Sequence, residues 1–238
     1  MVVTIKYLVI SDIHGNVRSL KAVIGSELNN IDVILVAGDL SSYSGEYVNV
    51  LEILNTIALK NRKVITVIGN MDSPSLIDII NSSYPSITCL HGTITRLGKL
   101  TIAGLSGGLY SPFNTPFELS EDDFRKLIAN IVKKISIIEN RYLALLSHTP
   151  PYGTKVDLTF TGLHVGSKSI RKFIEEFKPL VAISGHIHEA RGIDRLGNTL
   201  IVNPGPLFKG YYALLAVSYT HLRAHETSLH LVCRLLLE

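Results

Sequence analysis

Two hydrophobic patterns alternate along this chain, and they predict strands and helices in turn. Short continuous apolar runs are typical of buried strands, and they occupy residues 7–10, 33–36, 64–68, 142–146 and 180–183. Apolar residues also recur at the spacing of one helix face, most clearly in residues 16–29 and 46–59. Strands that alternate with helices predict an α/β domain.

Capping and turn signals complete this outline. Ser120 and Ser167 are expected to cap helices that run to about residue 138 and through residues 168–178. A short helix through residue 80 is predicted to open with Ser73 as its N-cap and Pro74 in its first turn, and Asp72 is expected to cap the same helix. Short strands are expected at 87–89, 92–97 and 100–103, a hairpin over 191–202 and a final strand at 211–216. We find no repeat or linker, which favours one domain.

A polar break follows each of the five apolar runs, and the breaks carry residues that bind metals. In order along the chain these residues are Asp12 and His14, Asp39, Asn70, His148, and His186 with His188. The carboxyl ends of neighbouring strands meet at one edge of an open α/β sheet, so these side chains are expected to converge. Carboxylate, amide and imidazole groups without cysteine suit a cation that takes mixed oxygen and nitrogen ligands. A glycine beside three of the breaks, at Gly38, Gly69 and Gly185, is expected to let the backbone turn sharply.

Composition narrows the class of protein. The 238 residues are 46% hydrophobic and 18% charged, as in a globular chain with a substantial core. The net charge of +3 is small and the basic residues are scattered, which favours a small substrate over nucleic acid. No apolar run is long enough to span a bilayer, and no signal peptide is recognised. Cys89 and Cys233 make no disulfide framework, so we expect a cytoplasmic protein, with its oligomeric state left open.

Residues 217–238 differ in character from the rest. In one reading frame VSYTHLRAHET and LVCRLLLE resemble translated short-read sequencing adaptors, with three residues between them in place of a variable index. We therefore expect one native domain over 1–216, cut within or just after its final strand, and a non-native tail over 217–238. Two alternatives are an amphipathic helix in the tail and a metal cluster formed by His221, His225 and His230.

The polar breaks together resemble the motifs of the calcineurin-like metallophosphoesterase superfamily. The matching blocks are Asp-x-His, Gly-Asp, Gly-Asn-x-Asp, a lone His and Gly-His-x-His, and the resemblance runs from Asp12 to about Pro206. It implies a four-layer αββα fold, a β-sandwich flanked by helices. It also implies a centre of two divalent ions, for which the ligand types favour Mn²⁺, Fe or Zn²⁺.

The resemblance also implies a role for each residue. Asp12, His14 and His188 would hold one ion, and Asn70, His148 and His186 the other. Asp39 would bridge them. Two such ions clamp the attacking and leaving oxygens of a phosphoester, and a hydroxide that bridges them is the nucleophile. We predict catalytic roles for Asp39, Asn70, His148 and His164.

Met71 departs from the family pattern. Many members have a histidine there that protonates the leaving oxygen, whereas a thioether has no proton to give. His164 is the candidate replacement acid, and the alternative is a loop residue that bonds to the backbone. The loops 106–110 and 112–116 form either a wall of the site or an irregular connection.

These features predict a metal-dependent hydrolase of phosphodiesters, with phosphomonoesters as a second substrate class. The alternative is a non-catalytic interaction scaffold on the same fold. Because scaffolds tend to lose ligands and all seven positions here hold a suitable donor, the sequence favours the enzyme.

Overall fold

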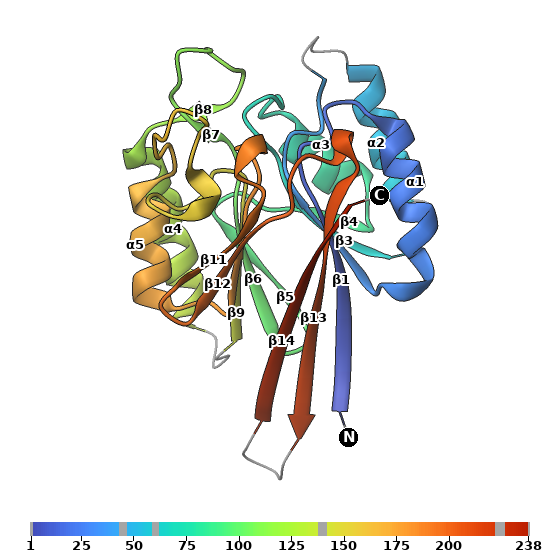
Figure 1. The fold of residues 1–238 in the computed structure, drawn as a ribbon, viewed down its shortest axis with the longest axis vertical. Helices are drawn as coiled ribbons and strands as arrows, with labels where there is room; N and C mark the ends of the chain where they lie inside the picture. Colours follow the sequence, from blue (N-terminus) through green and yellow to red (C-terminus); the bar gives the residue numbers. More distant parts are fainter. Residues whose placement is uncertain (1, 43–46, 59–61, 138–141, 222–226, 238) are drawn as a thin grey trace.

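Two six-stranded sheets lie between two groups of helices in the computed structural model, which describes residues 2–42, 47–58, 62–137, 142–221 and 227–237. Helices α1 to α3 cover one sheet and α4 with α5 cover the other (Figure 1). The helices are α1 (Val17–Glu27), α2 (Tyr47–Ala58), α3 (Leu76–Ser83), α4 (Glu121–Ile135) and α5 (Lys168–Phe177), with short 3-10 turns at Leu28–Asn30, Lys155–Asp157, His188–Ala190 and Leu207–Lys209. The expected αββα layering is confirmed.

The order of strands in the first sheet is β14-β13-β1-β2-β3-β4, and in the second it is β11-β12-β10-β9-β6-β5. Their bounds are β1 (Val2–Ile10), β2 (Val33–Ala37), β3 (Lys63–Val67), β4 (Ile87–Cys89), β5 (Thr93–Leu97), β6 (Leu100–Leu105), β9 (Tyr142–Ser147), β10 (Val181–Ile183), β11 (Gly192–Leu196), β12 (Thr199–Asn203), β13 (Tyr211–His221) and β14 (Thr227–Leu237). A small third sheet pairs β7 (Gly108–Leu109) with β8 (Glu118–Leu119).

Side-chain alternation along the strands builds three cores. Leu8 and Ile10 of β1 pack toward the helices, whereas Tyr7 and Val9 pack between the sheets. The second sheet likewise buries Leu145 of β9 against α4 and α5. Because both faces of the central strands are covered, their sequences are continuously apolar rather than alternating.

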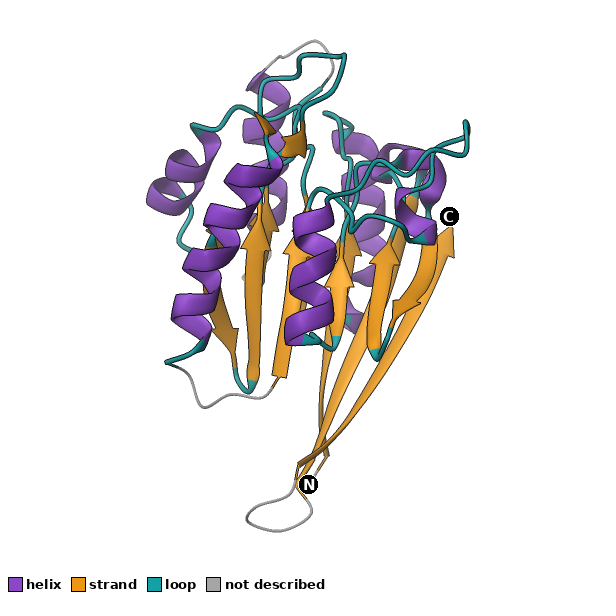
Figure 2. Ribbon diagram, turned by 90° about the vertical axis from the view of Figure 1, so that its left-hand side faces the viewer, coloured by secondary structure: helices purple, strands orange, loops and turns teal. Residues whose placement is uncertain are grey.

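Parallel pairing brings the polar breaks to one edge. Strands β1 to β4 run parallel, as do β6, β9, β10 and β12. The loops that follow their carboxyl ends gather at the same edge of the two sheets (Figure 2). The convergence expected from the sequence therefore has a structural basis in the strand direction.

Most predicted elements are confirmed with shifts of a few residues. Strand β1 begins at Val2 rather than at residue 7, and α3 begins at Leu76 with Ser75 as its N-cap rather than at Ser73-Pro74. The predicted end residues 46, 59 and 138 lie outside the described part of the chain. None of the described helices is long and apolar enough to cross a membrane.

The final strand extends beyond its predicted end. Strand β13 continues to His221, so the first residues of the adaptor-like segment pair with β1. Residues 227–237 form β14, antiparallel to β13, so the alternative of a helix in this part of the tail is wrong. The side chains of His221, His225 and His230 lie outside the described residues.

Candidate metal centre

The seven predicted ligands lie at the edge where the two sheets meet, each in a loop that follows a parallel strand. These loops come after β1, β2, β3, β9 and β10. Backbone hydrogen bonds join them. Asp12 N donates to Gly38 O at 3.0 Å, and Gly185 N donates to His148 O at 3.1 Å. Neighbouring strand ends therefore hold one another in place.

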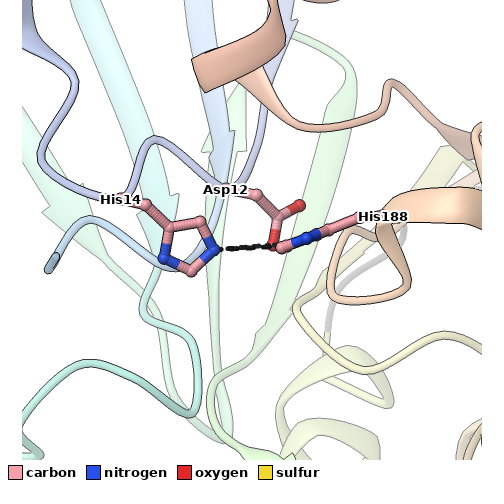
Figure 3. A group of neighbouring side chains, drawn as sticks. All are labelled: Asp12, His14 and His188. Carbon is pink, nitrogen blue, oxygen red and sulfur yellow. Dashed lines mark hydrogen bonds and ion pairs between the residues drawn. The ribbon is translucent and has the colours of Figure 1, made fainter. Parts of the chain in front are cut away.

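Asp12, His14 and His188 form one cluster (Figure 3). His188 Nε2 lies 3.3 Å from Asp12 Oδ1 and 3.2 Å from His14 Nε2. The Nδ1 of His14 faces the carbonyl of Ser41 at 3.3 Å, so Nδ1 carries the proton and Nε2 presents a lone pair. These three donors can hold one cation.

Asp39 lies between this cluster and a second group. Its Oδ2 is 3.6 Å from His14 Nε2, and its Oδ1 is 3.4 Å from His148 Nε2. The backbone N–H of Met71 donates to Oδ1 at 2.9 Å and fixes the carboxylate. The two oxygens of one carboxylate thus face two different imidazoles.

His148 and Asn70 present two acceptors to each other. The Nδ1 of His148 donates to the carbonyl of Ala37 at 2.8 Å, which leaves Nε2 as an acceptor in the neutral ring. This Nε2 lies 2.9 Å from Asn70 Oδ1, in a region where both residues are buried. Two facing hydrogen-bond acceptors repel each other unless a proton or a cation lies beside them. Both atoms have lone pairs that can bind a metal ion, so the pair fits a metal site.

A hydrogen-bond chain behind Asn70 fixes the orientation of its amide. Glu118 Oε1 accepts the hydroxyl of Thr115 at 2.9 Å, so the lone pairs of Thr115 Oγ1 are free to accept. Asn70 Nδ2 donates to that oxygen at 3.0 Å, which turns Asn70 Oδ1 toward His148. The sequence points to Thr115 only as part of the loop 112–116, and no sequence signal points to Glu118, because the contact is made only by folding of the loop.

His186 lies beside the group formed by Asp39, Asn70 and His148. Its backbone N–H lies 3.2 Å from both oxygens of Asp12, and its ring centroid lies 4.9 Å from that of His148. Asp12 itself belongs both to the cluster with His14 and to a group with Asp39 and His148. The structure therefore brings all seven predicted ligands into one continuous centre.

Strained backbone marks the same residues. Asp12, His14, Asp39 and His186 have φ values of 53°, 47°, 54° and 71°, in the left-handed region that non-glycine residues rarely adopt. Such conformations cost about 1–3 kcal/mol each and cluster at functional sites. The fold holds these four side chains in place at a cost in stability.

The glycines beside the ligands act mainly through their small size. Gly38 has a φ of +95°, as the expected sharp turn requires. Gly69 and Gly185 have no such φ, but the chain still turns directly after each, because Asp72 N donates to Gly69 O at 3.4 Å and Ile187 N donates to Gly185 O at 2.8 Å. A Cβ at Gly69 would overlap Asp39 Oδ1, and one at Gly185 would lie 2.6 Å from Asp12 Oδ2.

Burial lowers the pKa of two of the imidazoles, whereas at His188 the hydrogen bond and charge of Asp12 outweigh burial and raise the pKa. Burial lowers the pKa of His14 to about 4 and that of His186 to about 3, so both rings are neutral, the form that binds metals. Burial also raises the pKa of Asp39 above its ordinary value. Burial acts in the same direction on Asp12, but the hydrogen bond with His188 and the charges of His148 and His188 outweigh it and hold that pKa low.

Asp72 is a tie between loops and does not cap a helix. Its carboxylate accepts the backbone N–H groups of Leu40 at 3.1 Å, Ser41 at 2.7 Å and Gly69 at 2.8 Å. The expectation that Asp72 caps α3 is therefore wrong, because its carboxylate accepts hydrogen bonds from the loops that carry Asp39 and Asn70.

Met71 and His164 lie in different surroundings. Met71 lines the cavity above the metal centre. His164 Nδ1 lies 2.8 Å from the buried Asp157 Oδ1, and its ring packs edge-on against Tyr152. Val165 lines the cavity, whereas His164 is not among the lining residues. A catalytic role for His164 stays a prediction.

A comparison with family models identifies one family, and one curated relative and several solved structures are similar over most of the chain. A family model described as calcineurin-like phosphoesterase matches residues 5–190. Uncharacterized protein MJ1162 of Methanocaldococcus jannaschii is 35% identical over 216 residues, which cover 89% of this chain and 92% of that protein. One solved crystal structure is 25% identical, with a TM-score of 0.72 over 96% of this chain and 99% of the other. The crystal structure of TT1561 of Thermus thermophilus shares the fold at 18% identity, with a TM-score of 0.70 and the same coverage.

Proposed function

The chain belongs to the calcineurin-like phosphoesterase family, and we propose that it hydrolyses phosphodiester bonds at a centre of two divalent metal ions. Phosphomonoesters are a second substrate class. The observation that carries the proposal is the convergence of buried acceptors, above all His148 Nε2 and Asn70 Oδ1 at 2.9 Å. Such an arrangement is unfavourable unless a proton or a cation lies beside the two acceptors, and the aspartates and histidines around them are metal ligands by type.

The ligands divide into two groups in this proposal. Asp12, His14 and His188 hold one ion, and Asn70, His148 and His186 hold the other. Asp39 serves both, because its two oxygens face His14 and His148 separately. A shared carboxylate sets the separation of the ions and offsets their repulsion.

When bound, two such ions supply charge for the phosphoryl oxygens and lower the pKa of water so that it attacks near neutral pH. The chain's own residues hold this arrangement in place. Asn70 contributes a neutral oxygen, which limits the negative charge that an anionic phosphoester meets. Mixed imidazole and carboxylate donors favour Mn²⁺, Fe or Zn²⁺ over an all-oxygen Mg²⁺ site.

Met71 lies where many members of the family have a histidine that protonates the leaving oxygen. Its thioether lines the cavity but has no proton to donate. We therefore propose a preference for substrates whose leaving groups need little protonation. His164, oriented by Asp157, is the candidate for a substitute acid. General acid catalysis typically contributes roughly 10²–10⁴-fold, so either arrangement has a measurable consequence.

A cytoplasmic location and a small substrate are proposed from the use of cysteine and the net charge. Cys89, the cysteine outside the proposed non-native tail, is free in the structure, as suits a reducing cytoplasm. The modest net charge of +3 favours a small phosphoester over a long nucleic acid.

The test uses metal-free protein reloaded with Mn²⁺ and bis(p-nitrophenyl) phosphate as substrate. The wild type should release p-nitrophenolate, and Asp39→Asn should lose most turnover because the shared carboxylate loses its charge. The asparagine oxygen can still accept the Met71 N–H, so the fold should survive. Binding of Mn²⁺ without turnover of any aryl phosphodiester would favour the interaction scaffold instead.

A further inference from the structure

A cavity of about 710 Å³ opens from the metal centre. Pockets for small ligands generally measure about 300–1,000 Å³, so this cavity has room for a group much larger than phosphate. Asp39, Asn70 and His186 lie among its lining residues, together with residues of several segments outside the metal centre, which form the rest of the cavity wall. A substrate whose phosphate lies at the centre would therefore project one ester group along this wall.

Apolar side chains form much of that wall. Tyr110 and Phe113 line the cavity on one loop, and both are exposed, at 71% and 83%. Val165 and Ile187 line it from other segments. Large apolar groups that gather in one exposed place commonly mark a binding surface.

The loop that carries the two aromatic rings is fastened at its base. Ser111 Oγ donates to Glu118 Oε1 at 2.6 Å, and Phe113 N donates to Ser111 Oγ at 3.2 Å. The same carboxylate accepts the hydroxyl of Thr115, which orients Asn70. The aromatic wall and the metal centre thus share one anchoring residue, which fixes their relative positions.

The charge of the wall limits what binds there. No lysine or arginine occurs among the described residues that line the cavity, and Glu189 adds a negative group. Outside the metal centre there is consequently no positive charge along this described wall for a second phosphoryl group. This wall suits an uncharged ester group and disfavours di- and triphosphates.

We infer that the substrate is a phosphodiester with a single phosphoryl group, one of whose ester groups is a flat aromatic ring that packs against Tyr110 and Phe113. The inference rests on the proposed phosphoesterase function and deepens it. Aromatic rings suit this wall because they gain from offset or edge-to-face packing beyond simple burial.

The test measures binding by calorimetry, which needs no turnover. The probes are two phosphonate monoesters of equal charge, ethyl benzylphosphonate and ethyl methylphosphonate, titrated into the Mn²⁺-loaded full chain. The benzyl compound should bind about 10-fold more tightly, the scale of one ring stacked on an aromatic side chain. The cyclohexylmethyl analogue should bind less tightly than the benzyl compound, since it is apolar but not flat.

Substitution of the wall provides the second arm. The double variant Tyr110→Ala and Phe113→Ala should lose most of the difference between the two probes and keep the affinity for ethyl methylphosphonate. Both side chains are exposed, so the fold should tolerate their removal. The matched control is Ile137→Ala, an apolar residue that is 84% exposed and does not line the cavity.

Equal affinity of the wild type for the two probes would overturn the inference, as would a benzyl preference that persists in the double variant. Equal binding of the cyclohexylmethyl analogue would overturn its aromatic part. Turnover of bis(p-nitrophenyl) phosphate is measured separately, so failure of the proposed function and failure of this inference remain distinguishable.

Discussion

Gly69→Ala should damage the metal centre without adding or removing a ligand. A Cβ at position 69 would overlap Asp39 Oδ1 and would lie 2.5 Å from Asp39 N and 2.6 Å from Asp39 Cγ. A Cβ atom almost never lies within 3.0 Å of a heavy atom of a residue to which it is not linked in the chain, so the carboxylate of Asp39 must move. It cannot do so freely, because Met71 N already bonds to Oδ1 at 2.9 Å.

The variant should lose both stability and catalytic rate, and each loss can be estimated. Overpacking a close-packed site costs about 1–3 kcal/mol. For a chain of this size each kcal/mol corresponds to roughly 2–4 °C in Tm, so the melting temperature should fall by about 2–12 °C. Misplacement of a reacting group by about 1 Å costs on the order of 10²-fold in rate, and turnover of bis(p-nitrophenyl) phosphate should fall by about that factor.

The control is Gly25→Ala. This glycine lies in α1, and a Cβ there meets nothing within 4 Å. Alanine is the better helix former, so the variant should be about 0.5–1 kcal/mol more stable, with unchanged Mn²⁺ affinity. The assay is a thermal melt, a Mn²⁺ titration and a rate measurement on all three proteins. Wild-type Mn²⁺ affinity and rate in Gly69→Ala would refute the reasoning.

Four further outcomes are expected. Thr115→Val should weaken Mn²⁺ binding about 10-fold, because the Asn70 amide loses the hydrogen bond that orients it. Ser111→Ala should leave Mn²⁺ binding unchanged, and equal Mn²⁺ affinities of the two variants by calorimetry would contradict this prediction. Asp72→Asn should destabilise the chain by about 1–3 kcal/mol in urea unfolding, since a carboxylate that accepts three backbone N–H groups is lost; an unchanged midpoint would count against it. Removal of metal by a chelator should lower Tm. Addition of Mn²⁺ at about 100 times its Kd should raise the free energy of unfolding by roughly 2.7 kcal/mol, and a Tm that does not change with Mn²⁺ would argue against a metal site. Met71→His should accelerate esters with poor leaving groups more than esters with good ones, and a flat dependence of the wild-type rate on leaving-group pKa would exclude the proposed preference.

Strand direction explains why the sequence predicted so much of the centre. Apolar runs such as that ending at Ile10 are buried on both faces, and parallel pairing places the next polar residues together. Asp12 and His188 lie 176 positions apart in sequence, yet they meet at 3.3 Å for this reason. The α/β class and the position of the centre were therefore readable from the pattern of residues, whereas the αββα layering was implied by the family resemblance.

Contacts between loops were not readable in the same way. Asp72 was expected to cap the next helix, because a local signal favours a local partner, but it bonds instead to Leu40 and Ser41 across the chain. Thr115 and Glu118 support Asn70 through a loop whose path has no periodic pattern. Such roles depend on tertiary folding, which a single sequence reveals only where it carries a motif.

The tail illustrates another limit. Strand β14 pairs with β13 through main-chain hydrogen bonds, which almost any sequence of suitable β propensity can form at a sheet edge. Strand formation over residues 227–237 therefore says nothing of its origin. We propose that residues 217–238 derive from sequencing adaptors, and the nucleotide sequence of the locus in genomic DNA tests this directly.

The occupancy and spin coupling of Mn²⁺ at the centre form the most direct test of a dinuclear site. Metal-free protein is loaded with Mn²⁺, the bound metal is counted by elemental analysis, and the EPR spectrum is recorded for the wild type and Asp39→Asn. The predicted result is about two Mn²⁺ per chain with an exchange-coupled signal in the wild type, and weakened coupling or a lost ion in the variant. A single uncoupled Mn²⁺ in the wild type, unchanged by Asp39→Asn, would contradict the dinuclear centre.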